Sequence, residues 1–309
     1  MSREKRAVIL LAAYNGEKYI GAQIDSILNQ SFKDFDLIIR DDYSNDHTME
    51  ILKQRESLDK RISILQNKTE EHGQLKNFEF LMNLEKVKNY DYIFFSDQDD
   101  VWNVDKLAVS LNCLQKMESK YRMVYTNYSV FGSGKERIRY NDETYFLKNL
   151  HGLLVQNWIM GCTVGINQNL NKIAKSIPKS ADNHDNWIAN LAALIGSVEY
   201  ISNVTMNHRI HNNNVTQNVK TKTLRARALR ICSLIKNKKI IQRKKVDFCK
   251  ALLKSSIGKA VNVSQEKTLM EMLLMMKHRT LLNIFKMIKF RILGVNRIQS
   301  FIIYILLFA

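Results

Sequence analysis

The sequence predicts an α/β fold, in which a mostly parallel sheet is covered by helices on both faces and is followed by a basic helical region. Short apolar runs alternate with segments whose apolar residues recur at helical spacing, the pattern of proteins built from β-α units. Acidic residues directly follow two of these apolar runs. Residues 220–309 hold 21 Lys or Arg and three Asp or Glu, so they account for the formal net charge of +17 and leave residues 1–219 nearly neutral.

The first 130 residues contain the most regular alternation. The expected strands are residues 8–13, 35–39, 62–65, 92–95 and 123–128. The expected helices lie between them, at residues 19–28, from 48 onward, 75–84 and 104–117. Crossovers between parallel strands are right-handed, so the carboxyl ends of these strands meet at one edge of the sheet. Open α/β sheets bind their ligands at that edge.

After residue 130 the pattern is less regular. We expect an extended segment at 158–165, helices at 170–177 and 188–195, and a strand at 198–201. Basic helices with apolar faces are expected at 224–235, 248–253, 269–276 and 281–293. The last nine residues are wholly apolar, but spanning a bilayer takes about 20 residues. The change in charge and pattern divides the chain into a domain at 1–219 and a basic amphipathic helical region at 220–309.

The stretch from residue 92 to residue 102 is the most informative, because an apolar strand ends there in three carboxylates. Asp97, Asp99 and Asp100 repel one another unless a positive group neutralises them. Carboxylate oxygens suit Mg²⁺ or Mn²⁺, and such a cation would also hold a diphosphate. The alternative interpretation is an acidic turn with an Asp cap for the next helix.

Two other strand ends carry polar residues at the same edge. Tyr14 and Asn15 follow the first strand, and Asp41 and Asp42 follow the second. Together with the acidic turn, these strand ends define a site of the size of a nucleotide.

Four segments together resemble the family 2 glycosyltransferases, which have the Rossmann-like GT-A fold. They are Leu-Ala-Ala-Tyr-Asn-Gly at 11–16, Arg-Asp-Asp-Tyr-Ser-Asn-Asp at 40–46, Ser-Asp-Gln-Asp-Asp-Val-Trp at 96–102 and His-Asp-Asn-Trp at 184–187. Their order, spacing and strand context match the family over most of residues 6–220. Within the family, the Asp-Gln-Asp-Asp-Val-Trp segment and the Gly-Cys pair at 161–162 are most similar to bacterial rhamnosyltransferases of cell-surface polysaccharide synthesis.

The resemblance implies a role for each matching residue on the donor side. Ala13, Tyr14 and Asn15 would contact the donor nucleotide, and Asp42 would accept a hydrogen bond from the ring N–H of uracil or thymine. Asp97 and Asp99 match the Asp-x-Asp motif of the family. Asp97 would lie near the ribose and the metal, while Asp99 would bind the cation that bridges the diphosphate. Asp100 would only cap or support this turn.

The resemblance also implies the residues on the acceptor side. Asp185 matches the carboxylate that acts as general base, and Arg209 and His211 match a loop that meets the diphosphate or the metal in some members. The base motif of the family is often Glu-Asp, whereas this chain has His184 before Asp185. A single base opposite the leaving group implies one displacement with inversion at the anomeric carbon, without a covalent intermediate.

The expected function is therefore that of an inverting glycosyltransferase dependent on Mg²⁺ or Mn²⁺. It would transfer rhamnose from dTDP-rhamnose to a glycan or lipid-linked acceptor in cell-surface polysaccharide synthesis. The first alternative is a hexosyl- or N-acetylhexosaminyltransferase that uses a UDP-sugar. An alternative of another class is a non-catalytic protein of the same fold that binds a membrane or a nucleic acid.

Each candidate residue also has a structural interpretation. Asp42 and Asp185 are suitably placed to cap the helices that follow them, and His211 lies in a polar stretch where a solvated side chain is common. Trp102 is expected in the core. Trp187 is left open between the core and contact with a sugar.

The basic region has three interpretations: a solvated face, a nucleic-acid site or a membrane-binding surface. Helices that lie on a membrane carry Lys and Arg on one face and apolar residues on the other, as here. Interleaved aromatic residues and a recognised nucleic-acid motif are both lacking, so membrane binding is favoured. The four cysteines have no metal-site or disulfide spacing, and we expect reduced thiols in a cytoplasmic protein on the inner face of the cell membrane.

Overall fold

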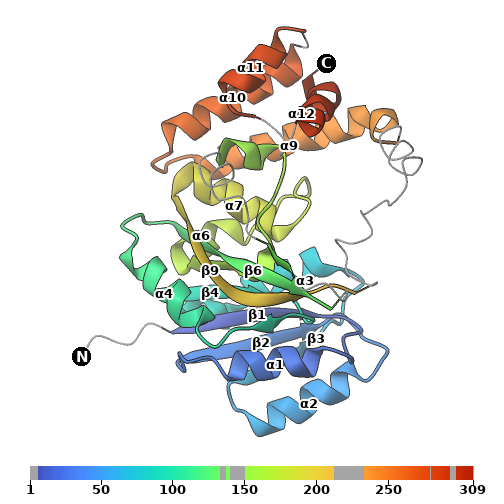
Figure 1. Ribbon diagram of the computed structural model, residues 1–309, viewed down its shortest axis with the longest axis vertical. Coiled ribbons are helices and arrows are strands. Elements are labelled where there is room, and N and C mark those ends of the chain that lie inside the picture. The colour runs from blue at the N-terminus through green and yellow to red at the C-terminus, as the bar shows by residue number, and fades with distance from the viewer. Residues whose placement is uncertain are drawn as a thin grey trace.

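The computed structural model describes residues 6–132, 137–139, 150–211, 233–278, 280–292 and 297–308. A nine-stranded sheet lies at its centre (Figure 1). The strands are β1 (Ala7–Ala13), β2 (Phe35–Asp41), β3 (Ile62–Gln66), β4 (Tyr92–Ser96), β5 (Val101–Trp102), β6 (Arg122–Phe131), β7 (Arg137–Arg139), β8 (Val164–Asn167) and β9 (Ser197–Arg209). Their order is β3-β2-β1-β4-β8-β6-β9-β5, and β7 pairs with β6.

The first half of the sheet is parallel, as expected. β1 pairs in parallel with both β2 and β4, and β2 pairs in parallel with β3. Beyond β4 the sheet becomes mixed, because β8 runs antiparallel to β4 and β6, and β5 runs antiparallel to β9. The α/β fold is confirmed, while its parallel character is strongest on the side that carries the first four strands.

Helices cover both faces of this sheet (Figure 1). The helices are α1 (Ile20–Leu28), α2 (Thr48–Leu58), α3 (Gln74–Asn83), α4 (Lys106–Lys116), α6 (Gln168–Ala174), α7 (His184–Ile195), α9 (Lys238–Ser256), α10 (Val263–Lys277), α11 (Asn283–Lys289) and α12 (Arg297–Ile303). Ile9 and Leu11 of β1 pack in one apolar cluster with α1, α2 and α4. Val8 and Leu10 pack in the other, with α3, α6 and α7. The alternation of side chains along a strand therefore separates two layers of core.

The C-terminal helices extend the second of these layers (Figure 1). Every residue of α7 is buried. Trp187 of α7 meets Phe248 of α9 edge to face, with the ring centroids 5.8 Å apart. The π-helical turn η5 (Tyr304–Phe308) closes the same core, and Gln242 of α9 donates a hydrogen bond to the Leu307 carbonyl. Helix α7 is therefore enclosed between the sheet and the C-terminal helices.

Trp102 of β5 and Trp187 of α7 are both core residues. Trp102 is buried, as expected, and Trp187 is buried as well, with its Nε1–H donating to the Ala174 carbonyl at 2.9 Å. This contact assigns Trp187 to the core and answers the question that the sequence leaves open.

Several elements are longer than their apolar patterns indicate. α7 begins at His184 rather than 188, because its polar first turn has the composition of a loop. β9 runs to Arg209 rather than ending at 201, and irregular register against β6 near Thr126 and Asn127 obscures its period. α9 covers 19 residues instead of the expected 248–253.

Other expected elements are shorter, irregular or outside the described residues. α6 ends at Ala174 rather than 177, and the segment 158–165 contains the short 3₁₀ turn η3 (Gly161–Thr163) and the start of β8. Most of the expected helix at 224–235 lies outside the described residues. Within the described part of the chain, no helix combines the length and the apolar character needed to cross a membrane.

The packing of α9 on α7 predicts a large loss of stability when Phe248 is truncated. Phe248→Ala should lower the free energy of unfolding by about 3–5 kcal/mol, because a buried aromatic side chain is replaced by a cavity. Chemical denaturation measures this change. Lys250→Ala, at an exposed position of the same helix, is the control and should change stability by less than about 0.5 kcal/mol. Equal effects of the two substitutions would contradict the shared core.

Candidate functional site

The carboxyl ends of β1, β2 and β4 form one rim, and hydrogen bonds hold their loops together. The Ala13 carbonyl accepts a hydrogen bond from the backbone N–H of Asp42 at 2.8 Å. Gln98, in the turn after β4, accepts from the Tyr14 N–H and donates to the Tyr14 carbonyl, both at 2.8 Å. A Cβ atom on Gly16 would lie 2.4 Å from Gln98 Oε1, so a larger residue there would displace the Gln98 side chain from its contacts with Tyr14.

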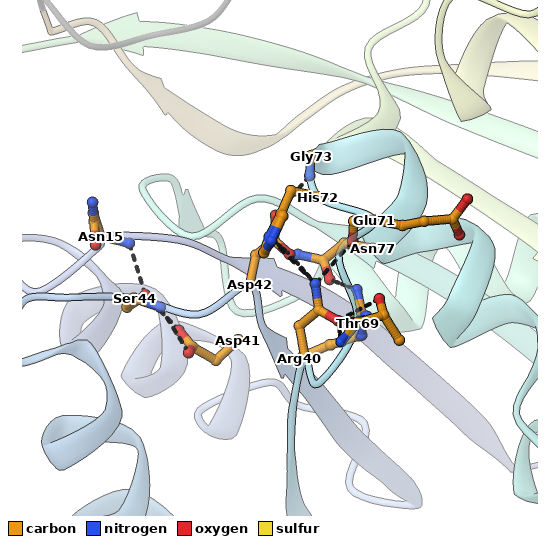
Figure 2. A network of polar contacts seen from close by, with 11 residues as sticks. Asn15, Arg40, Asp41, Asp42, Ser44, Thr69, Glu71, His72, Gly73 and Asn77 are labelled. Atoms are coloured by element: carbon orange, nitrogen blue, oxygen red, sulfur yellow. Dashed lines mark hydrogen bonds and ion pairs between the residues drawn. The ribbon is translucent and has the colours of Figure 1, made fainter.

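Asp42 lies at the centre of a polar network on this rim (Figure 2). Its Oδ1 accepts from Asn67 Nδ2 at 2.7 Å and its Oδ2 accepts from the Gly73 N–H at 2.7 Å. The half-exposed imidazole of His72 lies beside it, with Nδ1 3.3 Å from Asp42 Oδ1. These donors hold the carboxylate, whose side chain is 5% exposed, in a fixed orientation.

Arg40 supports this network from below (Figure 2). Its guanidinium donates to the side-chain carbonyls of Asn67 and Asn77 and lies 4.4 Å from the centroid of the Phe80 ring. Burial lowers the pKa of Arg40, although Asp42 counteracts the effect. Arg40 thereby holds Asn67, the residue that donates to Asp42.

Two residues of the rim have backbone conformations that are rare for side-chain-bearing residues. Asn15 has φ 47° and Tyr43 has φ 68°. Asn adopts this left-handed region readily, whereas the backbone of a bulky residue such as Tyr is strained there. Asn15 is held by its N–H donating to Ser44 Oγ and by its Oδ1 accepting from the Asn45 N–H, at 2.8 and 2.9 Å. Tyr14 and Tyr43, which follow the first and second strands, are both exposed.

The acidic turn after β4 places three carboxylates near enough for their charges to affect one another. Burial raises the pKa of Asp97, and the charges of Asp100 and Asp99 raise it further. Burial and the charge of Asp100 also raise the pKa of Asp99. Asp97 Oδ1 accepts one hydrogen bond, from Gln74 Nε2 at 2.7 Å. Such a set of repelling oxygen ligands is chemically suited to a hard divalent cation.

The residues at the end of β9 face this turn and contact Asp99. His211 Nε2 lies 2.7 Å from Asp99 Oδ2, and Arg209 Nε donates to the Asp99 carbonyl at 2.9 Å. The Arg209 guanidinium is also stacked between two rings, 4.6 Å from the centroid of Tyr19 and 4.4 Å from that of Phe131. The structure thus brings Asp99, Arg209 and His211 together, although they are about 110 residues apart in the chain.

The buried carboxylate of Asp100 forms hydrogen bonds with the end of β9. Its Oδ1 accepts from His208 Nδ1 at 2.8 Å and from the Arg209 N–H at 3.2 Å. The ligand atoms of Asp100, Cys162 and His208 lie within 4.8 Å of one another. Burial raises the pKa of the Cys162 thiol well above its usual range, so the thiol stays protonated, and a hard cation prefers oxygen ligands. We therefore interpret this cluster as a structural contact that stabilises the acidic turn, and not as a metal site.

Lys106 adds a buried cation under the same turn. Its Nζ is within 3.5 Å of the hydroxyls of Thr126 and Thr205 and 4.8 Å from the centroid of the Trp102 ring. Burial lowers the pKa of Lys106 to about 8, and the charge of Asp100 counteracts this shift. Lys106 therefore stays mostly protonated at neutral pH and partly balances the three carboxylates.

Asp185 lies in the first turn of α7, where three donors hold its carboxylate. Asn157 Nδ2 and the Asn186 N–H donate to Oδ1, and the Gly161 N–H donates to Oδ2 at 3.0 Å. Burial raises the pKa of Asp185 to about 6, although these hydrogen bonds favour the ionised form. A carboxylate with a pKa near 6 is ionised at neutral pH and remains basic enough to take a proton.

His184 connects this carboxylate to the end of β4. Its ring packs against those of Phe78 and Phe95, with centroids 4.0 and 5.1 Å away. Burial lowers the pKa of His184 to about 3, so the imidazole is neutral and serves packing. A Cβ atom on Gly161 would lie 2.5 Å from His184 Nε2, so glycine is required there. Through Phe95, His184 thus packs against β4 two residues before Asp97.

With this geometry in place, the sequence matches the family description Glycosyl transferase family 2 over residues 8–173. The chain belongs to this family. The match covers β1 through most of α6, including the rim and the acidic turn, whereas α7 and the C-terminal helices follow it.

Three individual comparisons add detail. The chain is 41% identical over 105 residues to a dTDP-rhamnosyl transferase of Shigella flexneri, RfbG. The aligned residues cover 34% of this chain and 36% of RfbG. The structure is similar to that of S. aureus TarS residues 1–349 in complex with UDP-GlcNAc, with a TM-score of 0.61, 14% identity, and coverage of 87% and 71%. It is also similar to the mannosyltransferase PcManGT of Pyrobaculum calidifontis in complex with GDP-Man and Mn²⁺, with a TM-score of 0.51, 13% identity, and coverage of 99% and 86%. The two structural likenesses establish the GT-A fold.

Sequence reasoning identified the rim, but it missed several residues that build it. Gln98 is the second residue of the Asp-Gln-Asp-Asp motif, so its position in that motif is an available signal. His72 follows β3, and the rule that strand ends share an edge could also have indicated it. Tyr43, Asn157 and His208 carry no comparable signal, because their roles depend on backbone conformation and on partners far away in the chain.

The donors around Asp185 predict its response to loss of Asn157. Asn157→Ala should raise the pKa of Asp185 above about 6, because one hydrogen bond that favours the ionised form is removed. Carboxyl ¹³C NMR titration measures the change. Asn169→Ala is the control, because Asn169 donates to the Lys120 carbonyl instead. An unchanged Asp185 titration in Asn157→Ala would contradict the proposed electrostatic contribution of this contact.

Proposed function

We propose that this protein is an inverting, metal-dependent glycosyltransferase that uses a nucleotide-sugar donor. The observation that carries the proposal is the approach of Asp99, Arg209 and His211 beside Asp97, on the same rim as Asp42. A diphosphate needs positive charge or a bridging cation, and a nucleobase needs a fixed hydrogen-bonding group. The rim offers both, and membership of the family supports the reaction class.

The donor nucleotide would lie along the rim from Asp42 toward Asp97. Asp42 is fixed by Asn67 and Gly73, so an oriented carboxylate oxygen can accept the ring N–H of thymine or uracil. Ala13, Tyr14 and Asn15 form the adjacent loop, and the exposed rings of Tyr14 and Tyr43 offer flat apolar surfaces for the base or ribose. Residues 13–15 and Asp42 thereby form the nucleotide end of the proposed site.

Rhamnose from dTDP-rhamnose is the donor we favour, because the Shigella relative is a dTDP-rhamnosyl transferase. A UDP-hexose or UDP-N-acetylhexosamine is the second candidate, supported by the UDP-GlcNAc complex of the TarS structure. Both nucleotides present the same ring N–H to Asp42. Contacts to the sugar therefore decide between the donors, and a single such contact changes preference by about 1–3 kcal/mol.

The acidic turn fits a divalent metal ion by the chemistry of its oxygen ligands. Asp97 and Asp99 would hold Mg²⁺ or Mn²⁺, with His211 as a further ligand, and the Mn²⁺ complex of the Pyrobaculum enzyme supports this choice. A cation bound there supplies Lewis-acid stabilisation of the negative charge on the leaving diphosphate. Arg209 is held over Tyr19 and Phe131 and directs a permanent positive charge toward the same region.

Asp185 would act as the base for the attacking hydroxyl of the acceptor. Its carboxylate is fixed by donors on both oxygens, which lowers the reorganisation needed when it takes the proton. The neutral His184 and the rings of Phe78 and Phe95 exclude water from one side of it. One base with no second carboxylate nucleophile in the proposal implies inversion at the anomeric carbon.

The proposed acceptor is a glycan or a lipid-linked sugar in cell-surface polysaccharide synthesis. The region 220–309, with its excess of Lys and Arg, is proposed to bind the anionic inner face of the cell membrane, where such an acceptor is presented. We accordingly propose a cytoplasmic, peripheral location. The catalytic domain at 1–219 would use the C-terminal helices both as packing partners and as the means of attachment.

A panel of nucleotide sugars with Mn²⁺ tests the reaction class. Wild-type protein should release nucleoside diphosphate from one of them, and Asp99→Ala should reduce this release at least about 100-fold. Asp91→Ala is the matched control, since Asp91 is exposed just before the opposite end of β4, and it should leave the rate unchanged. Absence of release by wild-type protein from every donor would instead favour a non-catalytic binding protein.

The raised pKa of Asp185 predicts a specific pH dependence. Because the base must be ionised, kcat/KM should rise about tenfold per pH unit below pH 6 and level off above it. Asp185→Asn should reduce kcat by about 10²–10⁴. Asp182→Asn, at an exposed position just before the same helix, should retain both the rate and the profile. A wild-type profile that is flat from pH 5 to pH 7 would argue against Asp185 as the base.

A further inference from the structure

Helix α11 and the turn before it present an exposed apolar face. This α11 face consists of Leu281, Leu282, Ile284, Phe285 and Ile288, all of them exposed. Leu281 is 83% exposed and Phe285 is 68% exposed, values typical of charged surface residues. Single exposed apolar residues are common, but five within eight positions form a patch that calls for a partner.

The helix periodicity separates this face from the side that packs on the protein. Asn283 and Met287, four residues apart, are buried, and Asn283 Nδ2 donates to the carbonyls of Met275, His278 and Phe308. Residues 281, 284, 285 and 288 have the i, i+3, i+4, i+7 spacing of a different face. α11 therefore has two apolar sides, one inside the fold and one outside it.

Exposed basic residues surround the α11 face. Lys277 precedes it, Lys286 and Lys289 lie on the same helix, and Arg291 follows. One acidic residue, Glu271, lies near enough to pair with this group, at 3.4 Å from Lys286. Apolar side chains bordered by Lys and Arg are the composition of helices that lie in the interface of a membrane.

The position of α11 also suits contact with a large flat surface. Helices α10 and α11 lie at the end of the molecule opposite α1 and α2, with the sheet between them (Figure 1). A membrane that contacts α11 would therefore leave the sheet and its rim clear. A second copy of this chain would bring Lys and Arg against Lys and Arg, so the charges favour an anionic lipid surface over self-association.

We propose that the α11 face inserts its apolar side chains into the interface of an anionic membrane, with the surrounding Lys and Arg contacting lipid headgroups. The inference deepens the proposed function by naming the surface that holds the enzyme beside a lipid-linked acceptor. The attachment is distinct from a transmembrane anchor, because the helix lies along the interface and the fold stays intact. Membrane attachment does not depend on catalysis, so membrane binding and catalytic activity can be measured separately.

Vesicle sedimentation with full-length protein tests the proposal. Wild-type protein should sediment with vesicles that contain phosphatidylglycerol and much less with vesicles of phosphatidylcholine alone, and added salt should weaken the binding. The double substitution Leu281→Glu and Phe285→Glu should weaken binding to the anionic vesicles about 100-fold, because two apolar side chains are replaced by charged ones. Both positions are exposed, so the fold should remain, as circular dichroism and thermal unfolding can verify.

Leu58→Glu is the matched control, because Leu58 is 72% exposed at the end of α2, on the opposite side of the molecule. This variant should bind anionic vesicles like wild-type protein. Sedimentation of the double variant at the wild-type level would overturn the proposal. A wild-type dimer that the double variant converts to a monomer, with vesicle binding retained, would overturn it in favour of a protein interface. Donor hydrolysis should be the same in all three proteins, so loss of catalysis and loss of membrane binding remain distinguishable.

Discussion

The repulsion among Asp97, Asp99 and Asp100 is the constraint on which the site depends. Three carboxylates occupy one turn at the end of a buried strand, and both burial and their mutual charge raise the pKa of Asp97 and of Asp99. Compensating charge comes from the core through Lys106 and from the end of β9 through Arg209, while the rings of His208 and His211 lie against Asp100 and Asp99. β9 pairs with β6 along most of its 13 residues and with β5 near its end, and this pairing carries its last residues to the acidic turn.

Much of the fold and the location of the rim could be predicted, because local patterns encode them. The alternation of Val8, Ile9, Leu10 and Leu11 between the two cores follows from the geometry of a strand, and acids after an apolar run indicate a strand end. β8 could not be predicted in the same way, because four residues give too short a pattern and its direction is set by neighbours on both sides. The polar sequence of β9 resembles a loop, because hydrogen bonds to β6 and β5 rather than apolar periodicity hold it in the sheet.

The side-chain network of the site was predictable only where it coincides with a motif. Gln98 binds the backbone of Tyr14 across 84 positions, and Asn157 binds Asp185 across 28. Neither contact can be predicted from the local sequence, because each depends on how the layers of the fold pack. The orientation of Asp185 likewise follows from α7 beginning at His184, one residue earlier, which places the carboxylate in a helix and not before it. Motif reasoning thus finds reacting groups more readily than the residues that hold them.

The enclosure of α7 has a consequence for how the protein is made. A ribosome releases a chain from its N-terminus, and domains generally fold as units during synthesis. The layer around α1, α2 and α4 draws on residues that precede 211, so it can form early. The layer around α7 includes Phe248, Leu307 and Phe308, and it stays incomplete until those residues emerge. The helix that carries Asp185 is therefore among the last parts to become ordered, and during translation its exposed apolar surface would be a natural substrate for chaperones.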